Sequence, residues 1–71
     1  MSIKAVNVRN QFRGRIARIV RGDVLSEIDV QTPSGTVTSV VTTRSVDELG
    51  LAPGSEVVAL VKATDVSLAK L

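Results

Sequence analysis

The sequence contains no cysteine, histidine, tryptophan or tyrosine, and its only aromatic residue is Phe12. Without cysteine no disulfide can stabilise the chain. Without cysteine and histidine, a zinc site, thiol chemistry and a histidine general base are all excluded. The sequence also has no serine in a glycine-flanked nucleophile elbow and no glycine-rich phosphate loop. We therefore predict that the protein is not an enzyme and that it coordinates no metal ion directly.

Long hydrophobic runs are missing as well. The longest apolar run, from Val57 to Val61, is far shorter than the ~20 residues that span a bilayer. The first residues, Met1 to Val6, contain no long apolar region and no cleavage signal. We expect a cytoplasmic protein that does not contact membranes.

Aliphatic residues make up the bulk of the chain, which has 71 residues of which 44% are hydrophobic. A chain of this length buries only about 60% of its unfolded surface, so an isolated monomer is marginally stable. The surplus of aliphatic surface is what contacts between subunits cover. We predict a single domain, residues 1–71, that associates with copies of itself.

Charge is unevenly distributed along the sequence, although the net charge is only +2. Every residue with a charge before Asp23 is basic, and these residues are Lys4, Arg9, Arg13, Arg15, Arg18 and Arg21. One interpretation is an anionic partner. The other is a solvated strand face whose arginines pair with Glu27 and Asp29 on a neighbouring strand.

The pattern of β-branched residues and turn residues predicts five strands. Their ranges are 2–20, 24–31, 36–43, 57–62 and 66–68, and a turn at 63–65 separates the last two. The second strand alternates, with one face formed by Val24, Ser26, Ile28 and Val30 and the other by Leu25, Glu27, Asp29 and Gln31. In the first strand Gly14 marks either a bulge or a close approach of another segment. The fourth strand is almost continuously apolar, so we expect both of its faces to be covered.

One segment has the pattern of a short helix. Ser45 as N-cap and Glu48 three residues later form a capping box, and Gly50 suits the left-handed position after the helix. We predict a single helical turn over Val46 to Leu49. Five short strands with a helical turn before the fourth are typical of an all-β, small OB-like barrel.

Two places in the sequence suggest anion binding. Thr42 and Ser45 precede a helix, where free N–H groups and hydroxyls favour an oxyanion; the alternative is that Ser45 only caps the helix. Lys62 ends an apolar strand beside the small Ala63 and is a second candidate for contact with an anion. The alternative is that Lys62 only extends its ammonium group into water.

Polar donors are also dense at the start of the chain. Arg9 lies among Asn7, Asn10 and Gln11. An arginine surrounded by amide groups is a further candidate for contact with an anion.

Four stretches in order carry a wider likeness. They are Val8-Arg9-Asn10-Gln11-Phe12-Arg13-Gly14, then Ile19-Val20-Arg21-Gly22 with Glu27-Ile28-Asp29-Val30, then Thr38-Ser39-Val40-Val41-Thr42 through Ser45-Val46-Asp47-Glu48-Leu49-Gly50-Leu51, and finally Gly54-Ser55-Glu56-Val57-Val58-Ala59-Leu60-Val61-Lys62-Ala63. Over nearly its full length the chain resembles the Mop family of molybdate-binding proteins, the molbindins. It is also similar to the related domains of molybdate transport ATPases and molybdate-responsive regulators.

The resemblance implies an OB-like barrel that assembles as a homo-hexamer, a trimer of dimers. It implies storage or buffering of molybdate or tungstate, bound as an oxyanion between subunits. Carried over by position, the oxyanion-binding residues are Arg9, Thr42, Ser45, Lys62, Ala63 through its backbone and Asn7, which stands where relatives often have serine.

The resemblance also implies a second oxyanion site after the first turn, formed here by Gly22, Val24 and Leu25. Relatives commonly read Gly-Ala-Val-Asn-Ala-Glu-Val there, whereas this chain reads Gly22-Asp23-Val24-Leu25-Ser26-Glu27-Ile28. Asp23 adds a negative charge and Leu25 removes an amide. A second site in this chain therefore depends on backbone N–H groups.

Two other functions remain as alternatives. The first is a domain that only oligomerises and binds no ligand. The second is a nucleic-acid-binding OB domain, which the basic N-terminal part of the chain favours. Such domains stack bases on aromatic side chains, and this sequence offers only Phe12 for that role.

Overall fold

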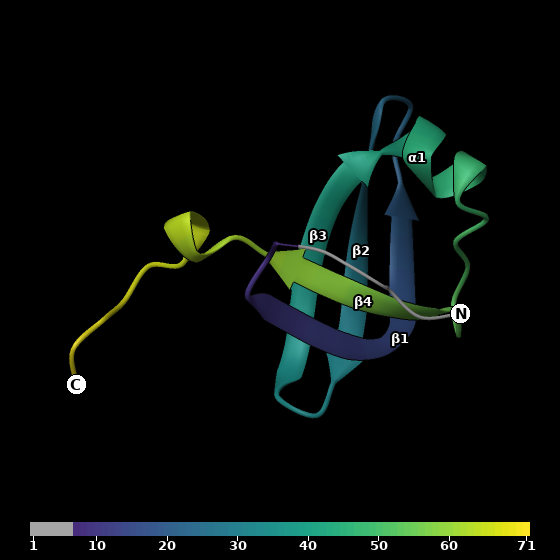
Figure 1. The fold of residues 1–71 in the computed structure, drawn as a ribbon. Helices are drawn as coiled ribbons and strands as arrows, with labels where there is room; N and C mark the ends of the chain where they lie inside the picture. The colour runs from purple at the N-terminus through teal and green to yellow at the C-terminus, as the bar shows by residue number, and fades with distance from the viewer. Residues whose placement is uncertain (1–6) are drawn as a thin grey trace.

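The computed structural model describes residues 7–71, and these form one antiparallel sheet, one helix and a C-terminal extension (Figure 1). The elements in chain order are β1 (Asn10–Arg21), β2 (Leu25–Thr32), β3 (Gly35–Thr42), α1 (Thr43–Glu48), β4 (Glu56–Val61) and a 3₁₀ turn at Ala63–Asp65. The strand order in the sheet is β3-β2-β1-β4. The prediction of an all-β fold with a short helix before the fourth strand is confirmed.

Strand β1 is shared between two neighbours, and this curls the sheet. Its first half pairs with β4 and its second half pairs with β2, so that Arg15 lies opposite both Glu56 and Gln31. The prediction that this strand starts at Ser2 is not borne out over residues 7–9, which are not strand, and residues 2–6 lie outside the described part.

Gly14 is a point of close approach and not a bulge. A Cβ atom at Gly14 would overlap the carbonyl oxygen of Gln31 and would lie 3.0 Å from Thr32 Cγ2. The register of β1 against β2 shifts instead between Ile16 and Arg18. The backbone of Gly14 can therefore cross close to β2 because it carries no side chain.

The core lies on the inner face of the curled sheet. The alternation predicted for β2 is confirmed, since Ser26, Ile28 and Val30 are all buried. Val24, which the same alternation placed on this face, precedes the strand and is 73% exposed. Ile16 of β1 and Val46 of α1 complete the buried cluster. So small a core agrees with the expectation that a single chain is only marginally stable.

Helix α1 starts earlier than the sequence predicts. Thr42 is the N-cap, and its hydroxyl accepts a hydrogen bond from the N–H of Ser45 at 3.1 Å. The assignment of Ser45 as the cap is therefore wrong, and Glu48 forms an ion pair with Arg44 instead of closing a capping box. The strand ends at Thr42. The last residue with an extended backbone before a helix takes the N-cap position, and here that residue is Thr42.

The end of α1 matches the prediction. Gly50 has a φ of 62°, its N–H donates to Asp47 O, and the N–H of Leu51 donates to Val46 O. This pair of hydrogen bonds is the Schellman arrangement, and it satisfies carbonyls that the helix leaves free.

The predicted fifth strand at residues 66–68 is absent from the structure. The predicted turn at Ala63–Asp65 is present, but the residues after it form no ladder and extend away from the sheet (Figure 1). Leu68 is 94% exposed. A strand needs a neighbour for its backbone groups, and within this chain the segment has none among the described residues.

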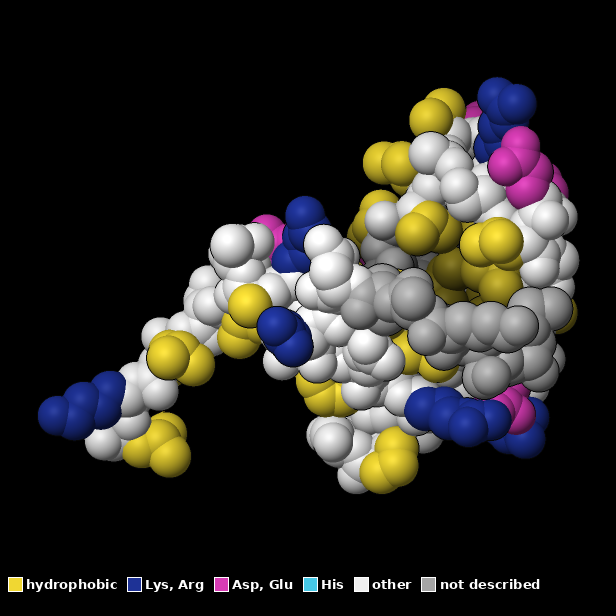
Figure 2. Space-filling view, in the orientation of Figure 1, with side chains coloured by type: hydrophobic (Ala, Val, Ile, Leu, Met, Phe, Trp, Pro, Cys, Tyr) yellow, Lys and Arg dark blue, Asp and Glu magenta, His cyan; other side chains and the backbone are white. Residues whose placement is uncertain are grey.

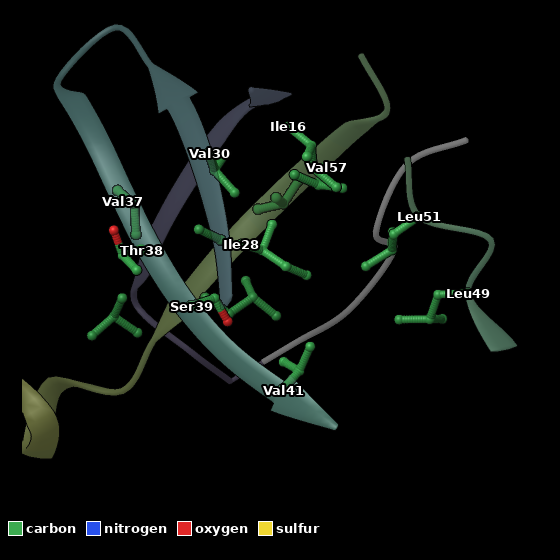
Figure 3. Close-up of a pocket in the computed structure, with 14 residues that line it drawn as sticks. Ile16, Ile28, Val30, Val37, Thr38, Ser39, Val41, Leu49, Leu51 and Val57 are labelled. Carbon is green, nitrogen blue, oxygen red and sulfur yellow. The ribbon is translucent and has the colours of Figure 1, made fainter. Parts of the chain in front are cut away.

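The inner face of the sheet stays partly open. A cavity of about 300 Å³ lies between strands, and its apolar lining includes Ile28, Val41 and Val57 (Figure 3). Hydrophobic side chains are visible in this hollow on the surface as well (Figure 2). Strand β4, which lines the cavity, is only half-buried, with Leu60 44% exposed. The prediction that both of its faces are covered does not hold among residues 7–71 of a single chain.

No helix in residues 7–71 is long and apolar enough to cross a membrane.

Candidate functional site

Thr42 and Ser45 form a hydroxyl pair where β3 passes into α1. Their oxygens are 2.8 Å apart, and either one can be the donor. Thr42 Oγ1 also accepts the N–H of Ser45. Because one hydroxyl hydrogen is used inside the pair, the other remains to donate to a ligand.

The residues predicted for a second site lie beside this hydroxyl pair. Leu25 is the register partner of Thr42, and the N–H of Thr43 donates to Val24 O at 2.8 Å. The N–H of Gly22 donates to Leu25 O at 2.9 Å. The backbone donor of Gly22 is therefore already used within the chain.

Arg9, Lys62 and Ala63 come together elsewhere. Asn10 at the start of β1 is paired with Val61 at the end of β4, and its side-chain amide donates to Val61 O at 3.1 Å. Arg9 precedes Asn10 and Lys62 follows Val61, so both cations flank this pair of strand ends. Their side chains are exposed, as are Ala63 and Asn7.

One chain does not bring all the predicted donors together. The Thr42–Ser45 pair lies beside α1, whereas Arg9 and Lys62 lie where β1 begins and β4 ends (Figure 1). Within residues 7–71 no hydrogen bond or ion pair links the two groups. Within one chain the predicted donors therefore form two separate groups.

Most of the other arginines are held by carboxylates. Arg13 and Arg15 both pair with Glu56 on β4, and Arg21 pairs with Asp47 on α1 at 2.9 Å. Glu27 and Asp29, the partners expected from the sequence, form no ion pair with these arginines. The prediction that the arginines pair with acids on a neighbouring strand therefore named the wrong acids. The register explains this for Arg13, because the first half of β1 pairs with β4 and not with β2. Arg18 lies opposite Asp29 in the register, yet no ion pair joins the two. Arg9 and Lys62 form no ion pair with a described acid.

These ion pairs shift the titration of the carboxylates. The hydrogen bond from Arg13, and then its charge, lower the pKa of Glu56, and Arg15 adds to the effect. The hydrogen bond from Arg21 likewise lowers the pKa of Asp47. Both carboxylates are therefore charged at neutral pH and are committed to the arginines.

Acid should weaken the fold partly through Glu56. Because its folded pKa lies below the unfolded value of about 4.3, the carboxylate stabilises the fold above that value. This contribution is lost as pH falls through the folded pKa. We expect the free energy of unfolding, measured in urea between about pH 5 and about pH 2, to fall less steeply in Glu56→Gln than in the natural chain. Glu27→Gln, at a residue without a described ion pair, serves as the control. If the free energy of unfolding fell equally steeply with pH in all three chains, the prediction would be contradicted.

Sequence reasoning missed a second pair of hydroxyls next to the first. Ser26 Oγ and Thr43 Oγ1 are 2.7 Å apart and buried, and Thr43 Oγ1 donates to Gly22 O at 2.7 Å. The signal was present, since Ser26 stands on the apolar face of an alternating strand. A polar residue at such a position indicates a buried hydrogen bond.

A metal centre has no support in the described residues, which contain no group of three or more histidine, cysteine, aspartate or glutamate side chains able to hold an ion. What the surface offers instead is hydroxyl, guanidinium and ammonium donors. Groups of this kind bind anions.

Comparison with known proteins identifies the class. The TOBE domain family matches residues 3–68. Molybdenum-pterin-binding protein 2 of Clostridium pasteurianum is 35% identical over 65 residues, which cover 90% of this chain and 96% of that protein. The chain belongs to the TOBE domain family and, within it, to the Mop family of molybdenum-pterin-binding proteins, as its sequence pattern predicted.

Solved structures agree with this assignment. The molybdate-binding protein from Sporomusa ovata superimposes with a TM-score of 0.88 at 33% identity, covering 93% of this chain and 98% of that one. The cytoplasmic molybdate-binding protein ModG, determined with molybdate bound, gives a TM-score of 0.82 at 35% identity. That match covers 86% of this chain and 44% of ModG. These neighbours are consistent with an OB-like fold.

Proposed function

We propose that this protein binds molybdate or tungstate and stores or buffers it in the cytoplasm. The observation that carries the proposal is the set of exposed donors without described acidic partners, Arg9 and Lys62 together with the Thr42–Ser45 hydroxyls, in a member of the Mop family. The relatives are named for binding molybdenum and not for catalysis, and nothing in this donor set supports a catalytic step.

The chemistry of the ligand fits this set of donors. Molybdate is a tetrahedral dianion that offers only acceptor oxygens near neutral pH. A site composed only of donors satisfies it, whereas a monoprotonated phosphate also needs an acceptor. Charge-assisted hydrogen bonds of the kind that Lys62 and Arg9 can make are worth about 1.5–3 kcal/mol each.

We place the sites between subunits of a homo-oligomer, a hexamer arranged as a trimer of dimers. The separation of the two donor groups within one chain supports this, because a second copy can supply the missing group. The open apolar cavity and the exposed Val66 and Leu68 of the extension also support self-association. Oxyanion binding between subunits then stabilises the oligomer by mass action.

Isothermal titration with molybdate, tungstate, sulfate, phosphate and a single-stranded oligonucleotide tests the proposal. We expect saturable binding of molybdate and tungstate and much weaker binding of phosphate. Light scattering of the same samples at micromolar concentration should give a hexamer, and a monomer would contradict the assembly. Oligomers that bind no oxyanion would indicate an assembly domain, and binding of the oligonucleotide alone would indicate a nucleic-acid-binding domain.

A further inference from the structure

The buried hydroxyls of Ser26 and Thr43 are not part of the donor set proposed above. Ser26 is 1% exposed and Thr43 is 8% exposed. Neither can reach solvent freely, so neither is a ligand for an exposed anion. Buried hydroxyls are retained where their hydrogen bonds fix a local arrangement, and the question is which arrangement these two fix.

The direction of every hydrogen bond in this buried pair is determined. The carbonyl of Gly22 can only accept, so Thr43 Oγ1 donates its one hydrogen to it at 2.7 Å. Thr43 Oγ1 must then accept from Ser26 Oγ, at 2.7 Å. The result is a directed chain that runs from Ser26 on β2 through Thr43 to Gly22 in the turn between β1 and β2.

The backbone of Thr43 makes a second connection to the same turn. Its N–H donates to Val24 O at 2.8 Å. Thr43 is thus tied to the turn at two points, through Gly22 and through Val24. It is also the first residue of α1 and the neighbour of Thr42, so these two bonds lie directly beside the Thr42–Ser45 pair.

The surface hydroxyl pair is held less firmly, although Thr42 Oγ1 also accepts the N–H of Ser45. Thr42 is exposed, and the hydrogen between Thr42 Oγ1 and Ser45 Oγ can point either way. Helix α1 is short, with six residues, and the Arg21–Asp47 ion pair that also holds it is exposed. Exposed ion pairs fix geometry weakly. The buried bonds of Thr43 are therefore a stronger constraint than this ion pair, and they add to the pairing of Thr42 with Leu25 and to the burial of Val46 in the core.

We infer that Thr43, supported by Ser26, is a positioning residue that holds the Thr42–Ser45 hydroxyls in the geometry for oxyanion binding. This inference rests on the proposed function. It adds that the affinity of the surface pair depends on a buried hydrogen-bond chain that never touches the ligand. Binding groups held by such supporting bonds lose affinity when the support is removed.

Thr43→Val removes the hydroxyl and keeps the shape of the side chain. We expect molybdate affinity, measured by isothermal titration, to fall about tenfold, as for the loss of one well-placed hydrogen bond. Thr43→Ser restores the hydroxyl and should bind within about twofold of the natural chain. Thr36→Val, which removes an exposed hydroxyl from β3, the strand that leads into α1, is the matched control and should leave affinity unchanged.

A double-mutant cycle separates positioning from a general loss of structure. The double variant Thr42→Val with Ser45→Ala lacks both surface hydroxyls. In that chain, adding Thr43→Val should lower molybdate affinity by less than about twofold. An equal loss in both backgrounds would overturn the inference, because Thr43 would then act by another route. Should Thr43→Val fail to fold, Ser26→Ala takes its place in the cycle with an expected loss of about threefold.

The same titrations distinguish the two proposals. If the natural chain binds no molybdate, the proposed function fails and the inference fails with it. If the natural chain binds and Ser45→Ala weakens binding while Thr43→Val does not, the inference alone is overturned.

Discussion

Lys62→Ala should lose most of its affinity for molybdate while remaining a folded oligomer. Lys62 is exposed at the end of β4 and has no ion pair with a described acid, so its charge is available to a ligand. Removing one charge-assisted hydrogen bond of about 1.5–3 kcal/mol corresponds to a loss of about 10- to 150-fold. Isothermal titration measures the loss, and light scattering shows whether the assembly persists.

The control for this prediction removes the same charge elsewhere. Arg18→Ala takes an exposed cation from β1, where it lies opposite Asp29 in the register. If binding depended only on net charge, both variants would weaken it equally. Unchanged affinity in Lys62→Ala would remove Lys62 from the site and leave Arg9 as the only charged donor proposed.

Gly14→Ala should strongly destabilise the fold. A Cβ at this position would overlap the carbonyl oxygen of Gln31, and backbone cannot move aside as a flexible side chain can. Either β1 or β2 has to shift, at the point where β1 leaves β2 to pair with β4. We expect the free energy of unfolding in urea to drop by about 2–4 kcal/mol.

Ala17→Ser is the comparison for Gly14→Ala. Ala17 is exposed at the register shift of the same strand, and a surface change there should stay within about 0.5 kcal/mol. Both variants are compared at one protein concentration, because the stability of an oligomer depends on it. A Gly14→Ala chain as stable as the natural one would show that β1 and β2 can separate locally without cost.

Features governed by neighbouring residues were predictable from the sequence. The alternation of β2, the turn at Ala63–Asp65 and Gly50 at the end of α1 all depend on residues within a few positions of one another. The N-cap was misassigned for a related reason. Thr42, Thr43 and Ser45 all carry hydroxyls, and which one caps the helix depends on where β3 stops pairing with β2.

Features governed by distant residues were not predictable. Arg13 and Arg21 of β1 pair with Glu56 and Asp47, which lie 26 or more residues along the chain, and no local pattern encodes such neighbours. The fifth strand was expected from its alternating residues, yet a strand forms only where a partner edge is available. Its absence shows that a local pattern of apolar residues is not sufficient for a strand.

By itself the sequence determined the family, the all-β class, the short helix and the types of residue that can donate to an anion. These follow from composition, local pattern and family likeness. Only the tertiary structure decided which donors share a location, since the sheet order places Thr42 with Leu25 and Arg9 with Lys62. It also revealed the buried Ser26–Thr43 hydrogen bond. Long-range pairing sets these neighbours, and it depends on how the whole sheet curls around a small core.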